Sequence, residues 1–359
     1  MVQEVVVLEG VGQRSVGQDR AGVPLILDRA RRFADAYLFP AASAIDAMET
    51  APEQQLRAMA DQGFFGLGAA GVSAAAMREV VAAFAGGSLG VAFLWLQHQG
   101  ALAAVARSTE PGIAARFTAA LAARTLRAGV AVTGLRGRDP LTARTAAGGW
   151  TLTGTQPWLS GWGGVDVVLV NALAADDRVL SLLVDVPSAG EPLPDSITAT
   201  SFDLVAARAS TTSTVRFTDH PVPTDRLVAT TTLAELQSRD GLGLAQNGAL
   251  ALGVAARAIA LAGAPAGSGA VQAEHAAEFA SATSALGTAD PALLPAARAT
   301  ASALAVRAAA TLAVRAGASA AVRGGDAERL SREALFLLVF GSRPAIRDEL
   351  LVQLGAPPA

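Results

Sequence analysis

The chain has 359 residues, enough for two or three packed units rather than a single core. Hydrophobic residues, alanine above all, make up 52% of the chain. Charged residues interrupt the long apolar stretches, so no window has about 18 uninterrupted apolar residues and we expect no transmembrane helix. There are no cysteines and all 28 basic residues are arginines, which excludes disulfides, thiolate metal sites and catalytic lysines. The net charge of −3 argues against nucleic acid as the main partner. The N-terminus does not read as a secretory signal, and we expect a cytoplasmic protein.

Helical periodicity dominates the first third of the chain. In residues 23–48 apolar side chains recur at steps of three and four, which predicts a helix that Pro40 breaks or kinks. Further helices are predicted over residues 52–62, 73–84, 88–107 and 111–122. We therefore assign residues 1–127 to an N-terminal all-α domain.

Strand patterns replace helical ones over residues 128–230, which we assign to a middle β domain. Residues 141–147 and 150–154 alternate, and Gly148 with Gly149 predicts a two-residue hairpin turn between them. Trp158 and Ser160 stand two residues apart at the end of a strand, so the strand period predicts that they share one face. Residues 165–171 form a continuous apolar run, as expected of a strand buried on both faces.

The last third is again helical, and we assign residues 231–359 to a C-terminal domain. Helices are predicted over residues 231–263, 270–286, 291–317 and 328–339, with a short closing helix over 344–354. Helices, then strands, then helices indicate an α+β multidomain protein with a β-barrel or sandwich in the middle and a four-helix bundle at the C-terminus.

Two segments of the β domain resemble motifs of a known family. The segment Gly-Thr-Gln-Pro-Trp-Leu-Ser at 154–160 is similar to G-x-K-x-W-I-S, with Gln156 in place of the lysine. Residues 202–223 are similar to G-x-R-x-S-x-T followed by F-x-D-V-x-V-P, through Arg208, Ser210, Phe217 and Asp219. In these motifs the chain resembles the acyl-CoA dehydrogenase family of flavoproteins, and the order of elements agrees over most of its length.

The resemblance implies FAD as cofactor, held beside the β domain. It sets Trp158 against the isoalloxazine face and Ser160 near flavin N5, whereas the alternative for Trp158 is a core residue that caps a small barrel. Thr133 is expected at the pyrimidine edge, and an ordinary strand threonine is the alternative.

A glycine-rich turn near the C-terminus is expected to reach the adenine end of the cofactor. Arg323, Gly324 and Gly325 partly match the family's G-G-x-G-Y, although the R-x-x-F-G segment that reaches the flavin diphosphate across a subunit interface is missing.

Three residues are candidates for substrate binding. Arg136 and Arg138 lie in the loop after Thr133 and suit a CoA phosphate or a pyrophosphate, with solvated loop arginines as the alternative. Ser210 is a further candidate for the flavin or substrate side. The three histidines have no metal-ligand spacing, so no metal site is predicted.

The general base is the main departure from the family. The reaction needs a carboxylate to remove the α-proton of the acyl thioester while a hydride leaves the β-carbon for flavin N5. In most of the family this base is the Glu of Glu-Gly-Thr, and here Phe340 stands in its place. A minority places the base at the start of the C-terminal bundle, where Asp240 is the nearest carboxylate.

Three functions remain open. The first is an FAD-dependent oxidoreductase of acyl-CoA dehydrogenase type that acts on an acyl-CoA or a related thioester. The second is a non-catalytic partner subunit of a heteromeric acyl-CoA dehydrogenase, and the third is a flavin-dependent monooxygenase on the same fold, which needs no α-proton base. The resemblance implies a homodimer, a homotetramer or a heteromer with a related subunit.

Overall fold

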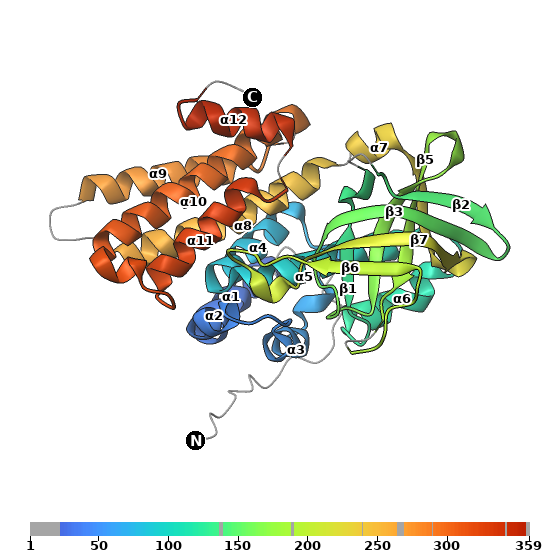
Figure 1. The fold of residues 1–359 in the computed structure, drawn as a ribbon. Helices are drawn as coiled ribbons and strands as arrows, with labels where there is room; N and C mark the ends of the chain where they lie inside the picture. The colour runs from blue at the N-terminus through green and yellow to red at the C-terminus, as the bar shows by residue number, and fades with distance from the viewer. Residues whose placement is uncertain are drawn as a thin grey trace, which may run out of the picture.

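The structure, a computed structural model, describes residues 22–135, 139–187, 190–238, 240–263, 269–288, 290–341 and 343–356. In Figure 1 the strands gather at one end of the molecule and the C-terminal helices at the other, with the N-terminal helices between and below them. The predicted fold class, helices followed by a β domain and then helices, is confirmed.

The N-terminal section contains six α-helices in the described residues. These are α1 (Gly22–Phe33), α2 (Phe39–Asp46), α3 (Glu53–Asp61), α4 (Ala74–Gly87), α5 (Leu89–Ala106) and α6 (Ile113–Ala122). The predicted break at Pro40 appears as a π-helical turn, Ala34–Leu38, with the proline in the first turn of α2. Proline is tolerated there because N–H groups in the first turn of a helix have no intrahelical acceptor, so the missing N–H costs no hydrogen bond.

One eight-stranded sheet forms the β domain. Its strands are β1 (Ala128–Ala131), β2 (Thr142–Ala146), β3 (Gly149–Leu159), β4 (Val167–Leu173), β5 (Arg178–Asp185), β6 (Ile197–Ser201), β7 (Ser213–Pro223) and β8 (Leu227–Thr232). The order is β6-β7-β3-β2-β4-β5-β8, and β1 pairs in parallel with β4. The β2–β3 hairpin pairs Ala146 with Gly149, so its turn is Ala147–Gly148, one residue earlier than predicted, and Gly148 supplies the positive φ of 79°.

The C-terminal section contains α7 (Leu233–Ser238), α8 (Asp240–Ala262), α9 (Gly269–Ala285), α10 (Leu294–Ala316), α11 (Asp326–Val339) and α12 (Pro344–Gln353). Helix α8 is central, since it packs against both α10 and α4. One hydrophobic core consequently contains residues of α1, α4 and α5 together with residues of α8, α10 and α11. The predicted domain boundaries at residues 127 and 230 lie near the first residue of β1 and the first residue of α7. They do not separate two hydrophobic cores, because helices from both ends of the chain share one core, and the division into domains stays a prediction.

Two described helical stretches, Leu89–Ala106 and Leu233–Ala262, are long and apolar enough to cross a membrane by length and composition. Within the fold, 72% and 61% of their most apolar windows are buried. Much of their apolar surface is therefore used in packing against the rest of the chain.

Arg332 links three sections of the chain through its guanidinium. From α11 it donates to the Asp46 carboxylate at 2.6 Å and to the Val205 carbonyl at 2.7 Å, and it pairs with Glu328 one turn away. Asp46 ends α2 and Val205 follows the β6 strand. Hydrogen bonding to Glu328, followed by that to Asp46, raises the pKa of Arg332 above its usual value. Partly buried pairs of this kind stabilise more than exposed ones, because water screens them less.

Gly253 sets how closely α8 approaches α4. A Cβ at this position would lie 2.7 Å from the Ala85 Cβ and 2.9 Å from the Gly86 backbone nitrogen, closer than real contacts allow. Gly253→Ala is therefore expected to destabilise the protein by about 1–3 kcal/mol through overpacking. Gly243→Ala on the same helix meets no atom within 4 Å and should be neutral or stabilising by up to about 1 kcal/mol. Thermal unfolding of both variants checks the contrast, and equal shifts would refute the close contact.

His98 connects α5 to both α6 and β1. Its Nε2 donates to the Leu121 carbonyl at 2.9 Å, and its Nδ1 accepts from the Ala128 N–H at 3.0 Å. Nδ1 has no room for a proton against that donor, so these partners fix the neutral ring. Burial lowers the pKa of His98 from 6.5 to about 4.

The lowered pKa of His98 predicts a pH dependence of stability. Since the folded pKa lies below the unfolded one, the contribution is complete above about pH 6.5 and is lost at about 1.4 kcal/mol per pH unit as the pH falls toward 4. His98→Gln, which can keep one donor and one acceptor, should lower the melting temperature at pH 8 and flatten its fall below pH 6.5. His275→Gln on α9 is the control, and a wild-type slope in His98→Gln would contradict the assignment.

Candidate functional site

Trp158 leaves the regular face of β3 through a β-bulge. Between the pairs Gln156–Val215 and Leu159–Ser213, β3 has two residues and β7 has one. Trp158 adopts a left-handed φ of 58°, which is uncommon for a bulky residue, and its side chain is 55% exposed. The indole stacks on Phe202 with ring centroids 4.3 Å apart and an interplanar angle of 17°. The end of β3 and the residue after β6 thus form an exposed aromatic pair.

Ser160 does not share this exposed face. The strand period predicted Trp158 and Ser160 on one side, but Ser160 is only 3% exposed and its hydroxyl lies 2.9 Å from the Thr212 hydroxyl. That prediction was wrong, because the extra residue of the bulge changes the side-chain alternation just before Ser160.

Buried hydroxyl groups form a short chain behind the bulge. Thr212 lies between Ser160 and Ser210, with oxygen–oxygen distances of 2.9 and 2.7 Å. The Gly161 N–H also donates to the Ser210 carbonyl at 2.7 Å. The structure therefore brings the two predicted serines together, although their hydroxyls are engaged inside the protein.

Gln156 organises the predicted pyrimidine-edge residue. This fully buried amide donates to the Thr133 hydroxyl at 2.7 Å and to the Pro157 carbonyl at 2.9 Å, and its oxygen accepts from the Gly134 N–H at 2.9 Å. Thr133 in turn donates to the Pro157 carbonyl at 2.5 Å. The loop after β1 and the end of β3 are thus held together in a fixed geometry directly before Trp158.

Phe340 is part of an aromatic cluster between α11 and α5. Its ring lies 4.8 Å from that of Phe93 in an edge-to-face arrangement and 5.4 Å from the stacked ring of Phe336. The position at which the resemblance expects a carboxylate is therefore apolar and packed against the N-terminal helices.

Arg298 fixes the end of α11 on which Phe340 stands. It is almost fully buried and donates to the Leu337 carbonyl at 2.9 Å, to the Phe340 carbonyl at 3.4 Å and to Ser302. Burial lowers its pKa to about 10, so it stays charged at neutral pH. A cation at the C-terminus of a helix is stabilised by the helix dipole.

Glu333 is a buried carboxylate on α11, seven residues before Phe340. One of its oxygens accepts from Arg329 at 2.9 Å, and the other has no hydrogen-bond partner among the described residues. Burial raises the pKa of Glu333, although Arg329 opposes the shift. The paired, enclosed position beside Ser88 and Ala209 favours a structural role.

The predicted adenine-contacting residues lie in the turn before α11. Arg323, Gly324 and Gly325 are exposed, and Gly324 has a φ of 91°. The Gly324 N–H faces Glu328 at 3.4 Å, so an acidic side chain stands where an anion would approach. No contact described for this turn reaches Trp158 or Thr133.

Other predicted residues are only partly described. Arg136 and Arg138 lie outside the described residues. Asp240 begins α8, but its side chain is likewise not described. The roles of all these residues stay predictions. No group of three His, Asp or Glu side chains in the described ranges could hold a metal ion.

Sequence reasoning missed several residues that shape the site. Phe202 was part of a motif but carried no role, and only the fold brings it onto Trp158. Gln156 was identified only as a replacement for lysine, whereas the structure shows that its side chain links the Thr133 hydroxyl and the Gly134 N–H to the end of β3. Arg298 offered no signal beyond an arginine in an apolar helix.

A flavin fits the described residues in part. The exposed Trp158–Phe202 pair gives an apolar platform for a planar ring, and Thr133 stands next to it through Gln156 and Pro157. The hydroxyls of Thr133, Ser160 and Ser210 already have internal partners. The described residues thus support the ring portion of FAD better than its diphosphate.

Comparison with known proteins agrees with this architecture. Residues 24–125 match the family described as "Acyl-CoA dehydrogenase, N-terminal domain". No curated protein matches the chain.

Solved structures match over nearly the whole chain. A glutaryl-coenzyme A dehydrogenase in complex with glutaryl-CoA has a TM-score of 0.78 at 17% identity, covering 96% of this chain and 97% of its own. Butyryl-CoA dehydrogenase from Megasphaera elsdenii has a TM-score of 0.77 at 16% identity, covering 97% and 99%. A probable acyl-CoA dehydrogenase from Mycobacterium abscessus has a TM-score of 0.78 at 19% identity, covering 92% and 98%.

Identities this low show the fold alone, and the family match covers the N-terminal section. Together with the helix–sheet–helix order, they lead to one conclusion: residues 24–125 match the N-terminal domain of the acyl-CoA dehydrogenase family, and the whole chain has the fold of the acyl-CoA dehydrogenases.

Proposed function

We propose that the protein is an FAD-dependent oxidoreductase of acyl-CoA dehydrogenase type, acting on an acyl-CoA or a related thioester. The exposed Trp158–Phe202 pair is the observation that carries this proposal. Trp158 combines a half-exposed indole with a left-handed φ, a backbone conformation that is energetically unfavourable for a bulky residue. Backbone strain of this kind concentrates at functional sites. FAD, when bound, would accept the two electrons that the substrate loses.

The protein's own residues would position the two reactants. Trp158 would stack against the flavin ring, and Gln156 would keep Thr133 and the Gly134 backbone in place at the ring edge. Phe340 cannot accept a proton, so a carboxylate elsewhere, for which Asp240 is the candidate, would remove the α-proton. Arg136 and Arg138 remain the candidates for the CoA phosphates.

A second function is favoured by the aromatic cluster around Phe340. The ring of Phe340, packed against Phe93 and Phe336, stands where the resemblance expects the base. A subunit that only supports a catalytic relative needs no base of its own. The non-catalytic partner subunit of a heteromeric acyl-CoA dehydrogenase is therefore the alternative.

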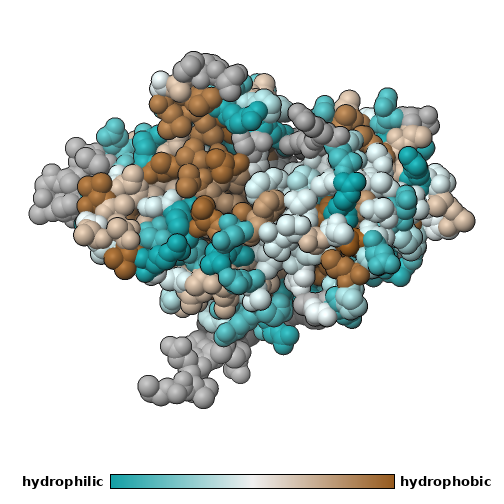
Figure 2. Space-filling view, in the orientation of Figure 1, coloured by the Kyte–Doolittle hydropathy of each residue, from teal (hydrophilic) through white to brown (hydrophobic). Residues whose placement is uncertain are grey.

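The surface supports an oligomer in either case. Figure 2 shows hydrophobic side chains gathered over the C-terminal helices, and Leu335 and Val339 on α11 are 51% and 65% exposed. Contiguous exposed apolar patches mark contact surfaces, whereas single exposed apolar residues do not. We propose a homodimer, a homotetramer or a heteromer with a related subunit, in the cytoplasm.

Replacing the indole tests the flavin platform. Purified wild-type protein should be yellow and contain FAD, and Trp158→Ala should weaken FAD binding at least about tenfold through lost stacking and apolar contact. Trp150→Phe, near the other end of β3, is the matched control and should retain the cofactor. Absorbance and the FAD-to-protein ratio report the result. A colourless wild-type protein that takes up no added FAD would overturn the flavin proposal and leave the partner-subunit function.

Replacing Asp240 tests the base. If Asp240 removes the α-proton, Asp240→Asn should retain FAD but lose anaerobic bleaching by an acyl-CoA, because the neutral amide cannot accept the proton. Asp61→Asn, an exposed site on α3, is the control. Unchanged bleaching in Asp240→Asn would exclude this residue, and wild-type FAD that no acyl-CoA bleaches would favour the partner subunit.

A further inference from the structure

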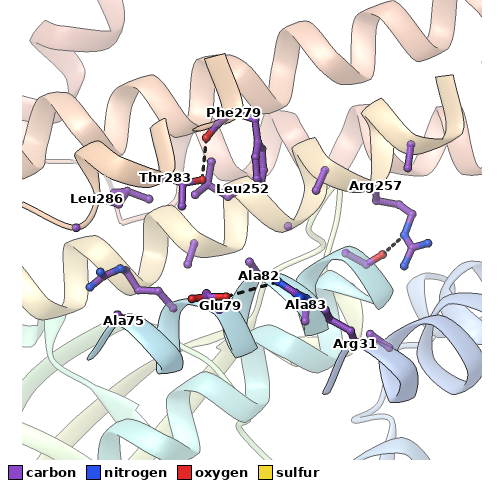
Figure 3. A pocket seen from close by; sticks show the side chains of 18 of the residues that line it. Arg31, Ala75, Glu79, Ala82, Ala83, Leu252, Arg257, Phe279, Thr283 and Leu286 are labelled. Carbon is purple, nitrogen blue, oxygen red and sulfur yellow. Dashed lines mark hydrogen bonds and ion pairs between the residues drawn. The ribbon is translucent and has the colours of Figure 1, made fainter. Parts of the chain in front are cut away.

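A cavity of about 730 Å³ lies between α1, α4, α8 and α9, away from the aromatic platform (Figure 3). Its apolar wall includes Ala82 and Ala83 of α4, Leu252 of α8, and Phe279 and Leu286 at the α9 side. This volume falls within the range of about 300–1,000 Å³ typical of small-molecule sites, which are mostly apolar with a few polar groups. No residue of the proposed flavin site lines it.

Small residues create the cavity. Helices α4 and α8 touch at backbone distance through Gly253 and Gly86. Leu286, the residue after α9, lies against α8 at Gly248, where a Cβ would be 2.5 Å from the Leu286 Cδ2. Between these contacts the cavity is lined by alanines, among them Ala83 and Ala256, whose methyl groups are too short to fill it. The short alanine side chains therefore leave room for the apolar chain of a ligand.

The rim carries charges that are not all balanced. Arg31 pairs with Glu79 at 3.5 Å, and Arg257 pairs with Asp35 and donates to the Gly86 carbonyl at 2.7 Å. Arg78 has neither an ion-pair partner nor a hydrogen bond within the described part of the chain, although its guanidinium reaches Gly287, 3.4 Å from where a Cβ would stand.

We propose that this cavity binds an amphiphile with one apolar chain and one anionic head, a medium-chain monocarboxylate, with the head on Arg78. A guanidinium can hold a carboxylate through two parallel hydrogen bonds, and such charge-assisted bonds are stronger than neutral ones. The chain would lie against Ala83, Leu252 and Phe279, where burial of each methylene is favourable. The site is distinct from the proposed flavin site and does not depend on it.

Decanoate binding to the full chain, measured by calorimetry, tests the proposal. Wild-type protein should bind decanoate saturably, and Arg78→Gln should raise the Kd at least tenfold while leaving the weaker binding of decanol unchanged. Ala83→Phe should abolish binding of both probes by filling the cavity, and Ala256→Phe serves the same purpose if Ala83→Phe does not fold. Arg107→Gln, an exposed arginine at the end of α5, is the matched control and should bind as wild type.

Three outcomes would overturn the proposal. The first is the absence of saturable decanoate binding to the wild type. The second is decanoate binding as tight as that of the wild type in Arg78→Gln, Ala83→Phe and Ala256→Phe. The third is a wild-type protein that sediments as an oligomer while Ala83→Phe sediments as a monomer, because the cavity would then be covered by a second copy of the chain.

Discussion

The backbone contact between α4 and α8 is the constraint on which the architecture depends. It joins the N-terminal helices to the C-terminal ones, and it exists because Gly253 and Gly86 carry no side chain at the crossing point. Once these helices touch, residues from both ends of the sequence share one core. Arg332 adds a polar link from the same C-terminal helices to α2 and to the segment after β6. The β domain is thus held against a helical body assembled from two distant parts of the chain.

The fold followed largely from the sequence, whereas the site did so only in part. Periods of 3.6 and 2 located most of the helices and the longer buried strands, since burial of one face leaves a repeat in the residue types. They did not predict β6 or β8, and the predicted helix over residues 231–263 includes the last two residues of β8. The bulge at Trp158 could not be foreseen in the same way. It depends on one unmatched residue relative to β7, a partner strand about 55 residues later, and no local pattern reports such pairing. The hairpin turn was misplaced by one residue because both Gly148 and Gly149 satisfied the turn preference.

Phe340, at the position where the resemblance expects a carboxylate, matters for packing as well as for chemistry. A carboxylate among Phe93, Phe336 and Arg298 would be drawn toward the buried guanidinium, whereas the phenyl ring leaves Arg298 to the carbonyls at the end of α11. The helix end and the ring are therefore adapted to one another. A glutamate at this position would introduce a charge that has to compete with these existing hydrogen bonds.

The contrast between two tryptophans gives the protein an internal optical probe. Trp95 is sealed in the helical core with its N–H bonded to the Phe64 carbonyl, while Trp158 stands half in solvent on Phe202. A collisional quencher dissolved in water can reach the second indole and not the first. Trp150 and Trp162 are partly buried, so Trp158 is the most exposed of the four indoles, and shielding of its emission from quenchers would report occupancy of this surface without any label.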